Sequence, residues 1–135
     1  MMTAKTRMTV SGALAAMVLA GCVVAPVESG RQDYQALCAG CHGDDGRGDG
    51  PALATLDAQV PDLTLLATAN GGIFPRVRVM SQIDGYTRDQ THGGMPAFWP
   101  LLEGDTVLIE TEPGVMTPTP ARLVALARYI ESIQQ

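Results

Sequence analysis

The chain is poor in lysine, in aromatic residues and in basic charge. Lys5 is its only lysine, and nine Lys plus Arg stand against fourteen Asp plus Glu, a formal net charge of −5. Such a chain offers no basic patch for a nucleic acid backbone, so nucleic acid is excluded as a partner. One Trp, two Phe and three Tyr are its aromatic residues. Its polypeptide core is therefore thin for a small domain.

Long apolar runs are also missing. The stretch from Met8 to Ala20 follows the basic residues Lys5 and Arg7 and is too short for a confident membrane span, so it resembles an export signal. It leads into Leu-Ala-Gly-Cys at positions 19–22, which resembles the lipobox of bacterial lipoproteins. In that pattern, cleavage leaves Cys22 as a lipid-bearing N-terminus. An ordinary signal peptide with a cysteine near the cut is the alternative.

These features predict three parts: a lipoprotein signal peptide at 1–21, a lipidated tether at 22–30, and one domain at 31–135. The acyl chains of a bacterial lipoprotein exceed what stable anchoring requires. We therefore expect a periplasmic protein attached to a membrane through Cys22. The sequence does not distinguish the inner from the outer membrane.

The most informative segment is Cys38-Ala39-Gly40-Cys41-His42. C-x-x-C-H is the attachment signature of a c-type haem. Two thiols three positions apart lie on one side of a helical turn, where each can add to a vinyl group of the same porphyrin. The adjacent His42 can then bind the iron. The pattern predicts one covalently bound haem c, and a porphyrin would add the apolar mass that the core lacks.

Two other types of site use a C-x-x-C pair. A structural zinc site needs four ligands, and the remaining candidates are Cys22 and His92, without a second C-x-x-C. A thioredoxin-like pair needs a βαβ pattern, which is not visible here. Three cysteines in an exported chain leave one odd thiol, and lipid on Cys22 accounts for it.

Apolar spacing predicts mainly helical structure. Tyr34, Leu37, Cys38 and Cys41 fall on one helical face, which indicates a helix over 31–41. Helices are also expected near 63–69, near 72–83, and from Pro120 to the end, with Thr119 as N-cap. Two short β-prone runs flank Pro113-Gly114 and predict a hairpin within 103–118.

The chain resembles the class I cytochromes c, of the small bacterial monohaem kind. The likeness runs from Tyr34 to Trp99 and resumes in the C-terminal helix. Its landmarks are Tyr34-x-x-x-Cys38-x-x-Cys41-His42-Gly43, Gly46-x-Gly48-x-Gly50-Pro51, Pro61-Asp62-Leu63-Thr64 and Met95-Pro96. The resemblance implies a class I cytochrome c fold. Three main helices would surround one covalent haem, and the hairpin would be an insertion before the C-terminal helix.

The resemblance also implies roles for the Gly-rich loop. Glycines at 43, 46, 48 and 50 would let the backbone run close to the porphyrin. The carbonyl of Pro51 would accept the Nδ1 proton of His42 and orient the ring. Asp44, Asp45 and Asp49 raise calcium as an alternative, but the EF-hand spacing is absent.

The sixth iron ligand is predicted to be Met95, since the distal Met of this family is commonly followed by Pro. Met80 falls on an expected helix face, where a Met is more often core, and Met116 lies far along the chain. His92 is the other candidate. Ligation by His and Met raises the reduction potential, whereas two His ligands lower it. We also expect Tyr34 to meet Tyr129. Arg76, Arg78 and Trp99 are expected to lie near the haem propionates.

A haem with two protein ligands has no vacant position for a substrate. We therefore predict an electron carrier, not an enzyme, whose partners are redox proteins of respiratory or dehydrogenase systems. One alternative is a cytochrome subunit of a larger redox enzyme, with the hairpin as docking element. Another is a ligand-binding or peroxidase-like haem protein with a displaceable sixth ligand.

Overall fold

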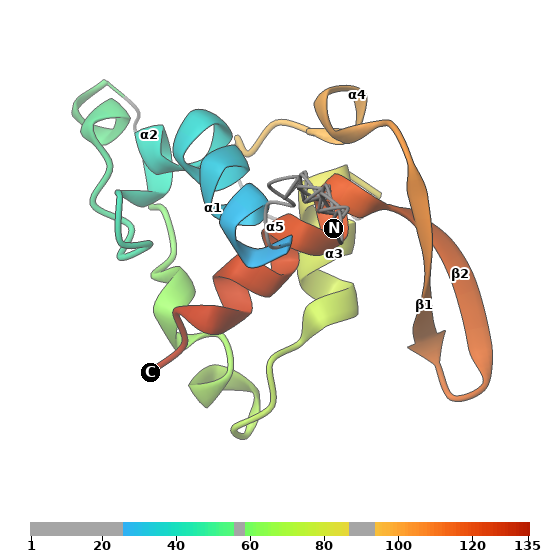
Figure 1. Cartoon of the computed structure of the whole chain (residues 1–135). Coiled ribbons are helices and arrows are strands. Elements are labelled where there is room, and N and C mark those ends of the chain that lie inside the picture. Colours follow the sequence, from blue (N-terminus) through green and yellow to red (C-terminus); the bar gives the residue numbers. More distant parts are fainter. Residues whose placement is uncertain (1–25, 56–58, 87–93) are drawn as a thin grey trace, which may run out of the picture.

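The computed structural model describes residues 26–55, 59–86 and 94–135 of the chain. Helices are its main regular structure, together with one two-stranded antiparallel sheet (Figure 1). The elements in chain order are α1 (Pro26–Leu37), α2 (Ala39–His42), the 3₁₀ turns η1 (Pro51–Ala54), η2 (Leu63–Leu65) and η3 (Thr68–Asn70), α3 (Arg76–Asp84), α4 (Trp99–Leu102), β1 (Thr106–Glu112), β2 (Val115–Pro120) and α5 (Ala121–Ser132). The predicted mainly α class, with a small hairpin before the last helix, is confirmed.

The first helix begins earlier than expected. Residues 26–30 belong to α1, so the predicted tether at 22–30 is wrong in its second half. Pro26 occupies the first helical position, where its missing N–H costs nothing. Glu28 lies in the first turn and pairs with Arg31 at 2.6 Å, an i,i+3 contact that supports a helix start.

Helices α1 and α5 cross at very close range in the centre of the molecule (Figure 1). A Cβ atom built on Gly30 would lie 2.0 Å from the backbone oxygen of Ala125, so glycine is required there. One turn further along, the rings of Tyr34 and Tyr129 meet with centroids 5.1 Å apart and planes at 51°. This tilted stacking adds to the burial of both rings and confirms the expected pairing.

The middle of the chain is less helical than predicted. The expected helix near 63–69 consists of η2 and η3, which are separate 3₁₀ turns. The expected helix near 72–83 begins only at Arg76. Gly71 and Gly72 have φ values of +70° and +88°, which lie outside the right-handed helical region. Apolar spacing alone did not show where these residues would stop a helix.

The hairpin pairs β1 with β2 from Thr106↔Pro120 to Glu112↔Val115, with an irregularity between Glu110 and Glu112. Gly114 has a φ of +77°, and its N–H donates to the Glu110 carboxylate at 2.7 Å. A Pro-Gly pair is the usual sequence for a turn that needs positive φ at its second central position. The hairpin extends away from the helices (Figure 1).

The last helix starts one residue later than predicted, because Pro120 is its N-cap and ends β2. Thr119 therefore belongs to the strand, and its hydroxyl donates to the Thr117 carbonyl at 3.2 Å. Helix α5 then supplies much of the buried core, including Leu126 and Ala127. Among the residues that the structure describes, no helix is long and apolar enough to cross a membrane.

Candidate haem-attachment site

The first thiol of the C-x-x-C-H segment lies at a one-residue break between α1 and α2, and the second lies within α2. Cys38 occupies the break, and its carbonyl accepts hydrogen bonds from the N–H groups of Cys41 and His42 at 3.1 and 2.9 Å. The predicted helix over 31–41 is therefore interrupted at Cys38 but keeps turning to His42. Cys38 is buried and Cys41 is partly exposed, and neither forms a disulfide.

Burial makes the Cys38 thiol a weaker acid than an ordinary cysteine. It raises the pKa of Cys38 to about 12, and the negative charge of Asp33 acts in the same direction. The side chain is therefore protonated at neutral pH in the folded chain. Cys38 also belongs to the buried core cluster that includes Tyr34 and side chains of α5.

The imidazole of His42 is held by a carbonyl group, but not by the predicted one. Its Nδ1 atom lies 3.4 Å from the carbonyl oxygen of Pro61, so the assignment of this role to Pro51 is wrong. With Nδ1 as donor, Nε2 is left with a free lone pair for a metal. Burial lowers the pKa of His42, which favours the neutral ring that metal binding needs.

Loop folding explains this change of partner. The N–H groups of Gly48 and Gly50 donate to the carbonyls of His42 and Cys41, at 2.8 and 3.2 Å, and the chain then enters η1 at Pro51. The following segment returns, and Leu63 donates to the Gly46 carbonyl at 2.7 Å. That return path brings Pro61 beside His42.

Two glycines allow these close backbone approaches. A Cβ atom on Gly50 would lie 2.4 Å from the carbonyl oxygen of Gly40, and one on Gly48 would lie 2.5 Å from that of Val60. Gly48 also has a φ of +76°, a conformation that other residues rarely adopt. The Gly-rich loop thus packs against the attachment segment, whereas the expected close approach was to the porphyrin.

Met95 lies on the same core as Cys38. It is partly buried, packs against the core cluster that contains Cys38, and its Sδ accepts from Nε2 of Gln82 at 4.0 Å. The backbone that follows Met95 is held against α3, because the Phe98 N–H donates to the Ile83 carbonyl at 2.9 Å. That bond satisfies one of the free carbonyls at the end of α3.

The other candidates have different surroundings. Met80 is buried in α3, as expected of core, and Met116 is 54 % exposed on β2. Arg76 pairs with Glu131 at 2.6 Å, and Trp99 is exposed. His92 and Cys22 lie outside the described residues.

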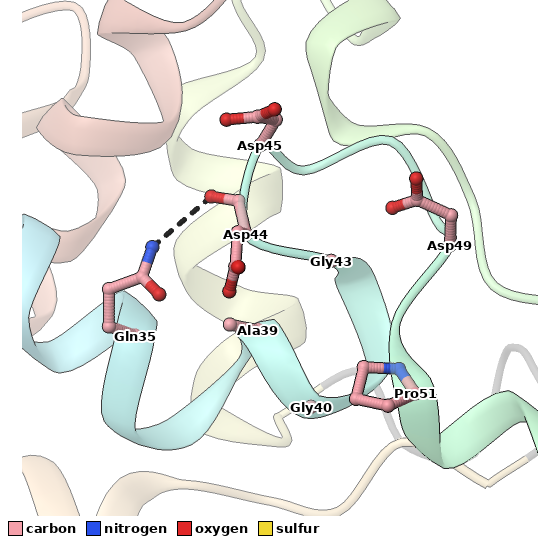
Figure 2. A pocket seen from close by; sticks show the side chains of 8 residues that line it. All are labelled: Gln35, Ala39, Gly40, Gly43, Asp44, Asp45, Asp49 and Pro51. Atoms are coloured by element: carbon pink, nitrogen blue, oxygen red, sulfur yellow. Dashed lines mark hydrogen bonds between the residues drawn. The ribbon is translucent and has the colours of Figure 1, made fainter.

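A cavity of about 460 Å³ lies beside α2 (Figure 2). Its lining residues are Gln35, Ala39, Gly40, Gly43, Asp44, Asp45, Asp49 and Pro51. Figure 2 shows the carboxylates around it and the hydrogen bond from Gln35 to the Asp44 carbonyl. Polar lining of this kind does not suit a porphyrin, and neither the two thiols nor His42 belongs to it.

No calcium site accompanies these carboxylates. Among the described residues, no cluster of three His, Cys, Asp or Glu side chains could hold a metal ion. The calcium alternative therefore gains no support from the structure.

The thiols and His42 fit a haem in chemistry and placement. Both sulfur atoms are free, they are three residues apart on one turn, and the imidazole that follows has its Nδ1 against a carbonyl. Bound there, haem would be joined by Cys38 and Cys41 through thioethers and by His42 through its imidazole.

Sequence reasoning missed three contributors to this site. They are Pro61, which holds His42; Gln82, which contacts Met95; and the Gly43 carbonyl, which accepts the Tyr34 hydroxyl. Pro61 and Gly43 carried a signal, since each belongs to one of the motifs that resemble the family, whereas Gln82 belongs to none.

Comparison with known proteins places the chain in a family. The family model of the cbb3-type cytochrome c oxidase, subunit III, matches residues 25–107, more than half of the chain. Neither a search of curated proteins nor a search of solved structures found a match. The matched region includes the C-x-x-C-H segment and ends as β1 begins. The chain therefore belongs to this c-type cytochrome family, and it is a haem-binding electron-transfer protein with covalently bound haem c.

Proposed function

We propose that this protein carries single electrons between redox proteins outside the cytoplasm, with one haem held between His42 and Met95. When bound, the haem supplies an iron centre that changes valence by one electron. The observation that carries the ligand assignment is the placement of Met95 against the core cluster that contains Cys38. In the class I fold, three helices would surround this haem, and α1, α3 and α5 are the candidates.

The protein side chains then have defined tasks. His42 offers Nε2 because its Nδ1 faces the Pro61 carbonyl. Met95 offers a thioether, which raises the reduction potential relative to a second imidazole. With both side chains in place, no coordination position is open for a substrate, so the protein transfers electrons without transforming a bound molecule.

Replacing Met95 tests the proposal. Met95→Ala should lower the reduction potential and let the ferrous protein bind carbon monoxide, and the wild type should have a low-spin ferric spectrum with the His/Met charge-transfer band. Met116→Ala is the matched control, because that methionine is exposed on β2. An unchanged potential in Met95→Ala would remove it as a ligand and favour His92. High-spin wild-type iron that binds carbon monoxide would instead favour a ligand-binding haem protein.

Membrane attachment through a lipid on Cys22 is part of the proposal. Helix α1 starts at Pro26, so only Val23, Val24 and Ala25 separate it from the lipidated residue. Four residue steps reach about 14 Å at full extension. The domain would therefore stay close to the membrane surface, in the periplasm.

A second candidate function is that of a subunit in a larger redox enzyme. The matched family is named for an oxidase subunit, and most of the hairpin lies beyond the match. The hairpin exposes Leu108 and Met116, at 64 % and 54 %. Four carboxylates accompany these apolar residues, and no cation occurs between Glu103 and Arg122. A partner with an apolar surface bordered by Lys or Arg would complement this surface.

Co-purification in mild detergent tests the subunit role. The wild-type protein should migrate with a haem-containing assembly on native gels, and Leu108→Ser with Met116→Ser should release it while the visible spectrum stays unchanged. Migration of the wild type as a free small protein would favour the mobile carrier.

A further inference from the structure

Gln82 lies on α3 and faces the side chain of Met95. Its Nε2 donates to Met95 Sδ at 4.0 Å, and both side chains are partly buried. A thioether sulfur is a weak acceptor with two lone pairs. One lone pair can bind iron while the other receives the amide N–H.

We propose that Gln82 is a positioning residue that holds the Met95 thioether and sets how strongly its sulfur donates to iron. The inference deepens the proposed function and rests on the ligation of iron by Met95. It concerns the Met95 side chain, because the backbone that follows Met95 is held by other groups.

Those other groups are a set of backbone hydrogen bonds. Phe98 N–H donates to the Ile83 carbonyl at 2.9 Å, and Leu101 N–H donates to the Phe98 carbonyl at 2.9 Å. Arg122 on α5 then donates to the Leu101 carbonyl at 2.6 Å. The segment after Met95 is thus tied to both α3 and α5 without Gln82. Loss of the Gln82 amide should leave these backbone hydrogen bonds in place and remove the N–H that the Met95 thioether accepts.

The direction of the effect follows from charge. An N–H directed at sulfur withdraws electron density from it, and a weaker sulfur donor stabilises ferric iron less than a stronger one. Hydrogen bonding to an iron ligand is one of the ways in which a protein sets the potential of a haem. Removal of the amide should therefore lower the reduction potential. Because the sulfur then donates more strongly to ferric iron, Met95 should also be harder to displace by an added ligand.

The experiment uses the full chain with its haem, purified in detergent. Gln82→Leu should lower the reduction potential and weaken imidazole binding to the ferric protein about fivefold, the change that one net hydrogen bond makes in an equilibrium constant. Gln82→Ala also lacks the amide, adds no charge and is a good helix former, so it should show the same two changes and tests the idea if leucine disturbs folding.

Gln32→Leu is the matched control, since Gln32 is an exposed glutamine on α1, and neither quantity should change. In a Met95→Ala background, Gln82→Leu should have no further effect on either quantity. An additional effect there would mean that Gln82 acts on the iron by another route and would overturn the inference.

Two remaining outcomes separate the two proposals. If Met95→Ala changes the potential while both Gln82 variants leave potential and imidazole affinity at wild-type values, the role of Gln82 is wrong and the ligand assignment stands. If Met95→Ala itself changes nothing, the ligand assignment fails and the inference about Gln82 fails with it.

Discussion

The phenolic hydroxyl of Tyr34 donates a hydrogen bond of 2.7 Å to the carbonyl oxygen of Gly43. Tyr34 is fully buried in α1, and Gly43 directly follows His42. The same ring packs on Tyr129 of α5. One side chain therefore connects the crossing of two helices to the backbone that follows His42, the proposed haem ligand.

The first prediction concerns this hydroxyl. Tyr34→Phe keeps the ring but removes the shorter of the two hydrogen bonds that the buried Gly43 carbonyl accepts, the other coming from the Gly46 N–H at 3.2 Å, so the free energy of unfolding should fall by about 1 kcal/mol. Guanidinium unfolding monitored by circular dichroism measures it. Tyr86→Phe is the matched control, since Tyr86 is 88 % exposed and should tolerate the change. Equal stabilities of the two variants would contradict the role given to the hydrogen bond.

The second prediction is that the protein loses stability in alkali because the Tyr34 phenol is buried. Burial raises the pKa of the Tyr34 phenol above its ordinary value of 10.0. The unfolded chain then loses this proton at lower pH than the folded chain does. The stabilisation is therefore complete below about pH 10 and is lost as the pH rises above that value. Unfolding free energies at pH 8 to 11 should fall less steeply for Tyr34→Phe than for the wild type, and parallel curves would disprove the assignment.

The helix crossing predicts an unusual response to alanine. In an exposed helix, Gly→Ala stabilises by about 1 kcal/mol. At Gly30 the new Cβ would meet the Ala125 backbone oxygen at 2.0 Å and its carbonyl carbon at 2.5 Å. Backbone atoms cannot move aside cheaply, so Gly30→Ala should destabilise the protein by about 2–3 kcal/mol. Gln32→Ala, on an exposed position of the same helix, should change stability by less than about 0.5 kcal/mol.

Membrane attachment is tested by Cys22→Ser. If a lipid on this cysteine is the anchor, the variant should appear in the soluble fraction after cell disruption, whereas the wild type sediments with membranes. The haem content should be unchanged, because Cys38 and Cys41 remain. Haem staining of both fractions measures the two quantities together. A variant that still sediments after a high-salt wash would show that the lipobox interpretation is wrong.

Local sequence signals were sufficient for some elements of the fold. The hairpin follows from two β-prone runs around Pro113-Gly114, and α5 follows from apolar spacing after Pro120. In both, the residues that decide the structure lie within a few positions of one another. The predicted tether is wrong at residues 26–30, which belong to α1. Pro26 and Glu28 are signals of a helix start.

In the site, as in the fold, features set by neighbouring residues were predictable and a contact between distant residues was not. The spacing of Cys38, Cys41 and His42 shows which chemistry the segment supports, because it depends on one helical turn. The partner of His42 was assigned to Pro51, but Pro61 holds that place. Nineteen residues separate Pro61 from His42, and only the folded path of the Gly-rich loop brings them together.

By itself, the sequence determined the haem-attachment chemistry, the acidic character of the chain and the mainly helical pattern, since these depend on residue identity and short-range spacing. Tertiary structure alone decided that Gly30 admits the backbone of Ala125, that Tyr34 holds Gly43, and that Gln82 meets Met95. These contacts join different parts of the fold, and packing sets their distances to a few tenths of an ångström. No local pattern encodes a distance between segments whose relative positions are fixed only when the core closes.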